Sequence, residues 1–214
     1  MAKNVDPLVF QLFEMTPRKG DLRKVAIIKA AIDCIAINGI ENLSLETVGK
    51  RLGIGRAHVG YYFKTIPEII DLVIQYIMAN AQKITVEKVT AARTPEQMIE
   101  AMAEAAFEWA HDFPEQASVY MLFFYYCAKD ADKREFQKTI RETGAARIEA
   151  ILEKIGNKGK KLQKARAERL AKNIQFLITG GVVELITTSA KQDRREAMAR
   201  WKAHVLAGIE QLLA

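Results

Sequence analysis

Two short helical patterns separated by a glycine lie in the N-terminal third of the chain. Ser44 is a favoured N-cap residue, and the apolar side chains after it recur at three- and four-residue intervals up to Leu52. Gly53 ends this first pattern, and a second short helix is predicted from about Arg56 to Tyr62. Two short helices joined by so tight a turn are typical of a helix-turn-helix.

The rest of the sequence also favours helices. Its five prolines stand at positions 7, 17, 67, 95 and 114, and the segments between them are rich in Ala, Leu, Ile, Glu and Lys, without alternating β-branched strands. We therefore predict an all-α fold. Besides the two short helices, the expected helices cover residues 21–37, 65–91, 95–112, 114–129, 133–155, 162–189 and 194–213.

The longest apolar run covers ten residues, 119–128. A membrane-spanning helix needs about 20, and the N-terminus has no signal-peptide pattern, so we expect no membrane insertion. A helix made from this run would be apolar on every side. It should therefore be surrounded by other elements, at the centre of a second domain.

Charge and cysteine content narrow the function classes. The net charge is +6, and residues 1–64 contain ten Lys and Arg against six Asp and Glu, an excess that suits phosphate recognition. The two cysteines, Cys34 and Cys127, form no CxxC pair, which argues against a disulfide framework and a zinc site. A reducing cytoplasm is the expected location.

Nothing in the sequence predicts catalysis. The three histidines at positions 58, 111 and 204 are scattered, and the sequence contains no HExxH, Walker or GxSxG motif. Glu100, Glu104 and Glu108 fall on one helical face, which we interpret as a solvated stripe. We expect no enzyme activity, no cofactor and no metal.

Three segments follow one another at characteristic spacing: IKAAIDCIAING over residues 28–39, LSLETVGKRLGI over 43–54, and YYFKT over 61–65. In order and spacing they resemble the DNA-binding domain of the TetR family of bacterial transcriptional regulators, a resemblance that covers residues 21–74. The sequence departs from the usual family pattern at Gly55, Gly60 and Ile66, where the family more often has a capping residue, Tyr and Lys.

The resemblance implies an N-terminal three-helix, homeodomain-like helix-turn-helix domain followed by a helical domain for ligand binding and dimerisation. We expect an N-terminal arm at residues 1–20, the DNA-binding domain at 21–64 and the C-terminal domain at 65–214. The implied protein is a repressor that binds a palindromic operator as a homodimer and is released by a small effector. The rival hypothesis is a ligand-independent, architectural DNA-binding factor.

The second short helix of a helix-turn-helix enters the major groove of DNA. Arg56 can pair with guanine, His58 can donate or accept a hydrogen bond, and Ala57 can touch a thymine methyl group. Tyr62 resembles the family tyrosine that contacts a backbone phosphate. The alternative is an ordinary exposed polar helix surface. The residues expected to contact DNA are Ser44, Arg56, Ala57, His58, Tyr61, Tyr62 and Lys64.

The last helix has a stripe of apolar residues with coiled-coil-like spacing, which needs a partner within the chain or in a second copy. A two-fold dimer would place two reading helices roughly 34 Å apart, one turn of DNA. The resemblance implies a four-helix bundle made by the last two helices of each subunit. Its expected residues are Gly180, Gly181, Leu185, Trp201, Val205, Ile209 and Leu212.

Aromatic and methionine side chains in the C-terminal half could line an apolar cavity, which would suit a hydrophobic or aromatic effector. The same side chains are equally typical of an ordinary protein core. The residues expected to line the effector site are Met98, Met102, Trp109, Tyr120, Phe124, Tyr125 and Phe176.

Overall fold

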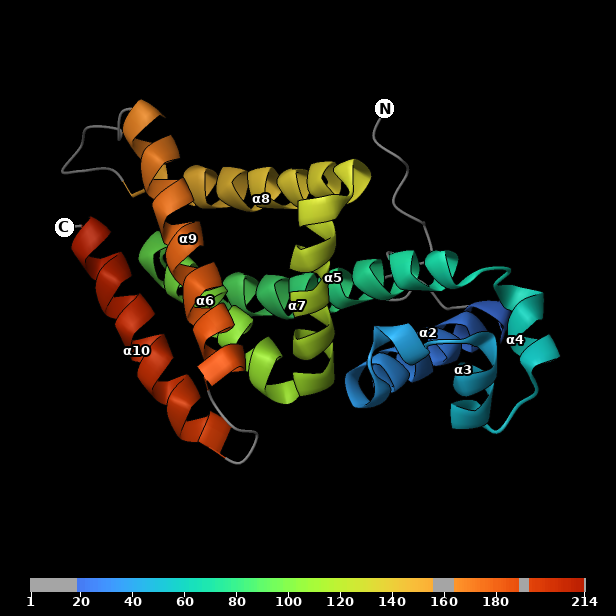
Figure 1. Cartoon of the computed structure of the whole chain (residues 1–214). Helices are drawn as coiled ribbons and strands as arrows, with labels where there is room; N and C mark the ends of the chain where they lie inside the picture. The colour runs from blue at the N-terminus through green and yellow to red at the C-terminus, as the bar shows by residue number, and fades with distance from the viewer. Residues whose placement is uncertain (1–18, 156–163, 189–192, 214) are drawn as a thin grey trace. The chain divides into compact units, whose positions relative to one another are not determined.

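A computed structural model describes residues 19–155, 164–188 and 193–213, and this part of the chain contains nine α-helices, one short 3-10 helix and no strand (Figure 1). The predicted all-α fold is confirmed. The helices are α2 (Lys19–Asn38), η1 (Ile40–Asn42), α3 (Leu45–Leu52), α4 (Arg56–Tyr62), α5 (Ile66–Ala91), α6 (Pro95–Asp112), α7 (Pro114–Lys129), α8 (Ala131–Leu152), α9 (Lys164–Thr188) and α10 (Arg194–Leu213). Most of the predicted arm at 1–20 and the sequence around 156–159 lie outside the described residues.

The chain divides into two compact units. The first extends to Lys83 and includes Ser118–Tyr120, and the second comprises Ile84–Ala117 and the chain from Met121 onward. The first unit therefore contains residues 66–83 of α5, which lie beyond the expected boundary at residue 64. Helix α5 starts in one unit and ends in the other.

The first unit has a core built from regularly spaced aliphatic side chains. On α2, Ile28, Ile32 and Ile35 recur at intervals of three and four residues, and each is at least 95% buried. Val48 of α3 and Val59 of α4 are fully buried as well. These buried side chains form the apolar core of α2, α3 and α4, in which α3 contacts both other helices.

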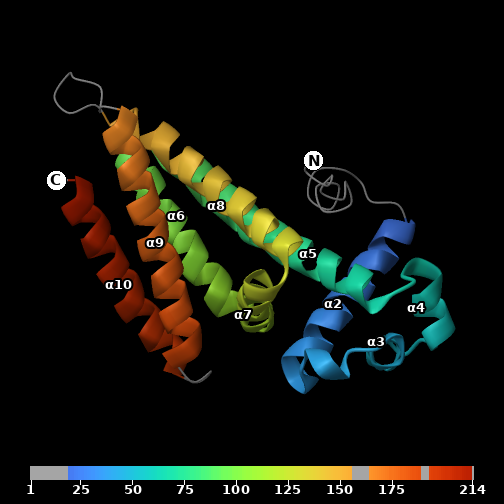
Figure 2. The ribbon, with the colours of Figure 1, turned by 45° about the horizontal axis from the view of Figure 1, so that its top comes forward.

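In the second unit, α9 packs between α8 and α10, and α6 contacts all three of these helices (Figure 2). The core of this bundle consists of fully buried side chains from the four helices. They include Phe107, Ile148, Leu152, Ile174, Leu185 and Ile209. No helix within the described ranges combines the length and apolar character that crossing a membrane requires.

The prediction that residues 119–128 form a fully surrounded helix is wrong for the single chain. On α7 only Val119 and Phe123 of this run are buried, and Tyr125 is 56% exposed. Val119 and Phe123 are four residues apart and share one helical face, so α7 buries one face and leaves the others partly accessible. Periodicity cannot reveal this arrangement, because an all-apolar helix has no polar side to mark the solvent.

The glutamates of α6 are not simply a solvated stripe. Lys88 of α5 lies 2.8 Å from Glu108 Oε1, and Lys202 of α10 lies 3.3 Å from Glu104 Oε1. All four side chains are partly buried. The interpretation of Glu104 and Glu108 is therefore corrected: they join α6 to two neighbouring helices.

Candidate nucleic-acid interface and C-terminal groove

Helix α3 begins at a reciprocal cap between Ser44 and Thr47. Thr47 N donates to Ser44 Oγ at 3.1 Å, and Ser44 N donates to Thr47 Oγ1 at 2.9 Å. This arrangement satisfies amide groups that the first turn of a helix leaves unpaired. The Ser44 hydroxyl also donates to Thr47 Oγ1 at 3.1 Å, so a phosphate contact by Ser44 would have to replace that bond.

The turn between α3 and α4 depends on two glycines. Gly53 has φ of 66°, in the left-handed region where a Cβ atom is unfavourable. A Cβ atom at Gly49 would lie 2.7 Å from Ile54 O and 3.4 Å from Arg56 N. The first residues of α4 therefore lie directly against Gly49. The sequence analysis did not identify this role of Gly49. A glycine inside a short helix is the signal that could have indicated a close approach by another segment.

Helix α4 turns its polar side to solvent and its apolar side inward. Val59 and Phe63, four residues apart, are at least 99% buried. Tyr61 is 73% exposed, and the other three residues expected to read bases are exposed too. These three are Arg56, Ala57 and His58. The structure thus brings all four of these predicted residues to one accessible helix.

Tyr62 occupies a half-buried position at the edge of this surface. Its ring centroid lies 5.0 Å from that of Tyr61, in an edge-to-face arrangement, and 5.9 Å from that of His58. Such aromatic contacts restrict the orientation of the rings. The phenol of Tyr62 is consequently held at the C-terminal end of α4.

Lys64 closes the C-terminal end of α4. Its Nζ atom donates to Gly60 O at 2.9 Å, and its backbone N–H donates to Glu68 Oε2 at 2.9 Å. Glu68 N in turn donates to Thr65 Oγ1 at 3.3 Å. The Thr65 hydroxyl thus caps the amide of Glu68, whereas the Glu68 carboxylate reaches the amide of Lys64. Because a lysine ammonium carries three N–H groups, the bond to Gly60 leaves Lys64 with donors for a phosphate.

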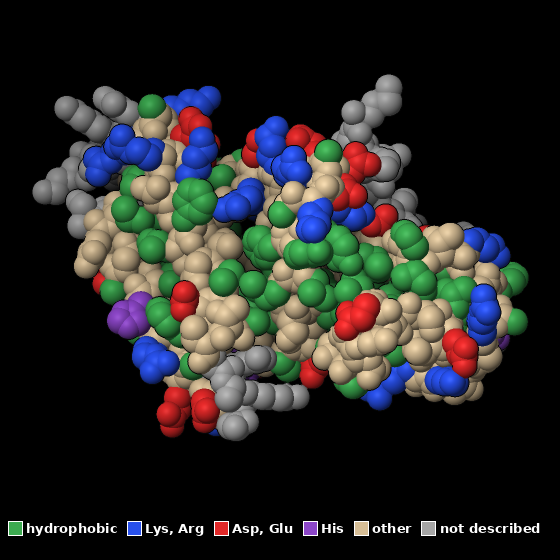
Figure 3. Space-filling model, in the orientation of Figure 1, with side chains coloured by type: hydrophobic (Ala, Val, Ile, Leu, Met, Phe, Trp, Pro, Cys, Tyr) green, Lys and Arg blue, Asp and Glu red, His purple; other side chains and the backbone are tan. Residues whose placement is uncertain are grey.

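Charged side chains surround the α3 and α4 surface, and Lys and Arg are visible over these helices in Figure 3. Lys50 Nζ lies 2.8 Å from Glu46 Oε1 on the exposed side of α3. The hydrogen bond from Lys50 lowers the pKa of Glu46 below its ordinary value, and the positive charges of Lys50 and Arg56 lower it further. Sequence reasoning left both α3 residues out of the interface.

Helices α9 and α10 form a surface groove of about 840 Å³. Five of the seven residues expected at a dimer interface line it, whereas Leu185 and Ile209 are buried within the chain. The five are Gly180, Gly181, Trp201, Val205 and Leu212. Asn173, Phe176, Leu177, Glu184, His204, Gly208 and Gln211 complete the lining.

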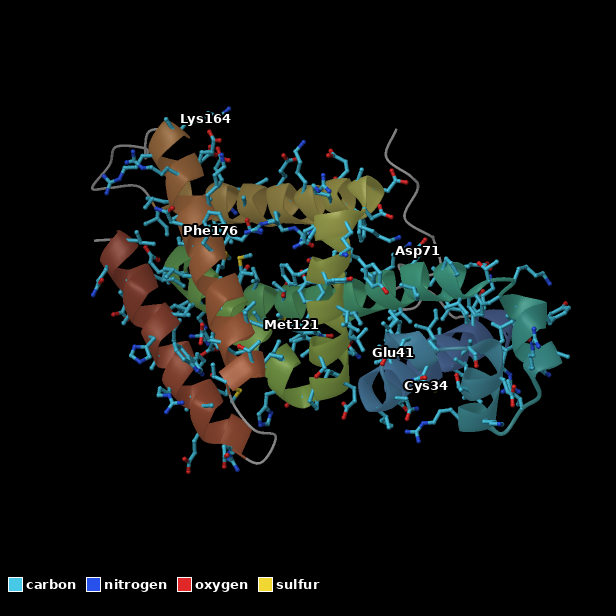
Figure 4. The ribbon with its side chains drawn as sticks, viewed as in Figure 1. Cys34, Glu41, Asp71, Met121, Lys164 and Phe176 are labelled. Atoms are coloured by element: carbon cyan, nitrogen blue, oxygen red, sulfur yellow. The ribbon has the colours of Figure 1, made fainter. Side chains whose placement is uncertain are left out.

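Of the residues expected at an effector site, only Phe176 lines this groove, and Figure 4 labels it on α9. Trp109 is buried, and its Nε1 atom donates to Gln116 Oε1 at 3.2 Å. Tyr125 is exposed, whereas Met98, Met102, Tyr120 and Phe124 are half-buried. The structure therefore does not gather all seven around the groove between α9 and α10.

Two polar atoms of the second unit are buried without a hydrogen-bond partner within the described part of the chain: Gln137 Oε1 on α8 and Trp201 Nε1 on α10. Buried polar atoms are nearly always paired, so each such atom marks a place where a water molecule or a further group could supply a partner. Trp201 was expected at the dimer interface, whereas Gln137 was not singled out from the sequence.

Comparisons with known proteins agree with this architecture. Residues 27–72 match the model of a family described as "Bacterial regulatory proteins, tetR family". No curated protein sequence gives a match. The fold is similar to that of a transcriptional regulator from Saccharomonospora viridis in complex with choline, with a TM-score of 0.74, 17% identity, and coverage of 88% of this chain and 96% of that chain.

Two further solved structures have the same fold. A TetR transcription regulator from Haloarcula marismortui has a TM-score of 0.66 and 14% identity over 86% of this chain and 97% of its own. The fatty acid degradation regulator FadR from Bacillus halodurans has a TM-score of 0.70 and 15% identity over 91% of this chain and 98% of its own. At such identities the likeness concerns the fold.

A tight turn, a buried apolar face and an exposed polar reading helix define a helix-turn-helix DNA-binding protein. The match over residues 27–72 indicates which class of helix-turn-helix this is. Residues 27–72 therefore resemble the DNA-binding segment of the TetR family of bacterial transcriptional regulators.

Proposed function

We propose that this regulator is a cytoplasmic repressor that binds a palindromic operator as a homodimer and is released by a small hydrophobic or aromatic effector. The observation that carries the proposal is the division of α4 into a buried apolar side and an exposed polar side. Val59 and Phe63 anchor the helix in the core, and Arg56 and Tyr61 are exposed on it. A helix held in this way can enter a major groove without unfolding its own domain.

Within this proposal Arg56 reads sequence, because a guanidinium can donate two hydrogen bonds to guanine O6 and N7. Ala57, His58 and Tyr61 add contacts to neighbouring base edges. Lys64, Tyr62 and Ser44 contact phosphates, which fixes the register of the protein on DNA without selecting a sequence. The roles of Arg56 and Lys64 can therefore be separated experimentally.

The test uses the operator selected from random duplexes by the purified protein. Arg56→Ala should reduce the preference for the operator over an unrelated duplex by about tenfold or more. Lys64→Ala should weaken binding to both duplexes and lower the salt slope by about one. Thermal unfolding of both variants controls for loss of the Lys64 cap on α4. Equal losses on both duplexes from both variants would contradict the assigned roles.

The groove between α9 and α10 supports a homodimer. Phe176 is 60% exposed there, and a Cβ atom at Gly180 would meet nothing within 4 Å, which leaves room for a second helix to approach. Two copies related by a two-fold axis would present the same surface to each other. A dimer of this kind would explain a palindromic operator.

Sedimentation of the full chain tests the dimer. The wild type should sediment as a dimer, and Phe176→Glu should shift it towards monomer, because two carboxylates would enter an apolar contact. Leu22→Glu is the matched control, since Leu22 is 54% exposed on α2, outside the groove. A monomeric wild type, or a Phe176→Glu variant that stays dimeric, would contradict the proposed interface.

The unpaired Gln137 Oε1 atom supports an effector site within the second unit. An effector with an N–H or O–H group could supply the missing donor, and the half-buried Met102 and Phe124 remain expected to line its site. The structural neighbour from Saccharomonospora viridis is a complex with choline, so a protein of this fold can hold a small molecule.

The effector is sought by screening hydrophobic and aromatic compounds, with choline and fatty acids included, for release of fluorescent operator DNA. At least one compound should lower operator affinity, and Gln137→Leu should reduce its effect without changing affinity in its absence. If no compound releases the operator, the chain is better described as a ligand-independent architectural DNA-binding factor.

A further inference from the structure

Helix α4 starts against one particular position of α3. The absent side chain of Gly49 leaves the space into which the backbone of Gly55 and Arg56 packs, with Arg56 N only 3.4 Å from where a Cβ atom would stand. Side chains three residues apart on a helix lie on the same side. Glu46 precedes Gly49 by three residues, so it lies on the side of α3 against which α4 begins.

Glu46 is therefore a neighbour of the base-reading arginine. Its side chain is 60% exposed, and it is already held by Lys50 at 2.8 Å. The charge of Arg56 contributes to the lowered pKa of Glu46, which agrees with this placement. An exposed glutamate is ionised at neutral pH, and the lowered pKa favours the same negatively charged form.

A carboxylate at this position conflicts with general DNA binding. DNA phosphates and the guanine O6 and N7 atoms are acceptors, so an ionised carboxylate gains nothing from them and is repelled by the phosphates. The amino group of cytosine, in contrast, donates to a carboxylate in the major groove. The residue would thus penalise most duplexes and be satisfied by a few.

We infer that Glu46 is a specificity-determining residue of the reading surface, which excludes sequences that do not offer a base amino group beside the contact made by Arg56. This inference rests on the proposed DNA-binding function. It assigns selectivity to repulsion as well as attraction, because specificity is a difference between two affinities. Lys50 fits the same scheme, since it screens the carboxylate from one side.

Glu46 also has an ordinary structural role. An acidic residue in the first turn of α3 interacts favourably with the helix dipole, and a Glu–Lys pair four residues apart stabilises a helix slightly. A purely structural role predicts a small loss of thermal stability and no change in the ratio of affinities for two duplexes. The two roles therefore differ in their readouts.

The experiment compares Glu46→Gln with Glu41→Gln, which removes the same charge at η1. Figure 4 shows Glu41 at the end of the N-terminal unit away from α4. Full-length wild type and both variants are titrated against the selected operator and an unrelated duplex of equal length at one salt concentration. Glu46→Gln should bind the unrelated duplex about threefold tighter and lose about tenfold in the operator preference.

Glu41→Gln should keep the operator preference of the wild type, and Glu46→Asp should retain part of it. The inference is overturned if Glu46→Gln keeps the wild-type preference within about twofold, or if Glu41→Gln loses as much. A wild type that prefers no sequence would instead contradict the proposed function itself. Repeating the random selection with Glu46→Gln identifies the operator position at which the variant no longer prefers one base pair.

Discussion

Arg51 of α3 donates twice to a single carboxylate oxygen of Asp33 on α2, from Nε at 3.1 Å and from Nη2 at 2.8 Å. The hydrogen bonds to Asp33, and then the negative charge of Asp33, raise the pKa of Arg51 above its ordinary value. The pair fixes the first helix of the helix-turn-helix to the preceding helix. Both side chains are at least 38% exposed, so water and salt weaken their attraction.

Asp33→Asn should consequently have a small and salt-dependent effect on stability. At low salt we expect the melting temperature of the variant to lie no more than about 3 °C below that of the wild type. At high salt the difference should be smaller, because screening already weakens the attraction between Arg51 and Asp33 in the wild type. Thermal unfolding followed by circular dichroism at two salt concentrations measures the difference. A loss that does not change with salt would indicate that packing, and not charge, joins the two helices.

Gly49→Ala and Gly60→Ala should have opposite effects. At Gly49 the new methyl group would stand 2.7 Å from the backbone oxygen of Ile54, which cannot move without shifting the turn. We expect a loss of about 1–3 kcal/mol of unfolding free energy. At Gly60 the nearest atom, Leu45 Cδ1, is 3.9 Å away. There alanine should add about 0.5–1 kcal/mol by favouring the helix.

Urea unfolding of the two glycine variants measures both changes. Because each substitution adds the same methyl group to a short helix, their difference isolates the contact with Ile54. Equal stabilities of the two variants would contradict the close approach of α4 to Gly49.

The adjacent glycines of α9 provide a second matched pair. A Cβ atom at Gly181 would lie 2.6 Å from Val205 Cγ2 and 2.8 Å from Phe107 Cζ, whereas one at Gly180 meets nothing within 4 Å. Gly181→Ala should therefore cost about 1–3 kcal/mol by forcing α6 and α10 away from α9. Gly180→Ala should leave the folded chain intact. Chemical unfolding tests both, and a well-tolerated Gly181→Ala would contradict the tight packing of these helices.

The two thiols should react slowly with alkylating reagents. Burial raises the pKa of Cys34 and, likewise, that of Cys127 above the ordinary thiol value. A raised pKa leaves less of the reactive thiolate at pH 8, and its fraction grows as the pH rises. Cys34, which Figure 4 labels, is only 5% exposed and should react more slowly than the half-buried Cys127.

Mass spectrometry after timed treatment with iodoacetamide measures the two rates. In urea the rates should become similar, since unfolding removes the burial that distinguishes the thiols. Rapid labelling of Cys34 in the folded protein at pH 8 would contradict its position in the core.

Local sequence signals predicted the ends of several helices well. Ser44 caps α3, Gly53 closes it, and Pro95 and Pro114 occupy the first positions of α6 and α7. Each signal acts within a few residues of the helix end, because capping and proline geometry involve neighbouring amides. The exposed residues of α4 were predictable for the same reason, since the buried Val59 and Phe63 fix which side faces inward.

Features that depend on contacts between helices were not predictable. The role of Gly49 requires knowing that α4 begins against it, and the position of Glu46 follows only from that contact. Phe176 lines the groove between α9 and α10, whereas the other residues expected at an effector site do not. Apolar and aromatic residue types do not reveal which of several helices will cover them.

The chain passes from the first unit to the second within helix α5 and not through a loop, because the division falls after Lys83. One inserted residue there would turn the preceding part of the helix by about 100° and displace it by about 1.5 Å along the axis. An insertion or deletion at this point must therefore be accommodated within the helix itself, a constraint that a loop would not impose.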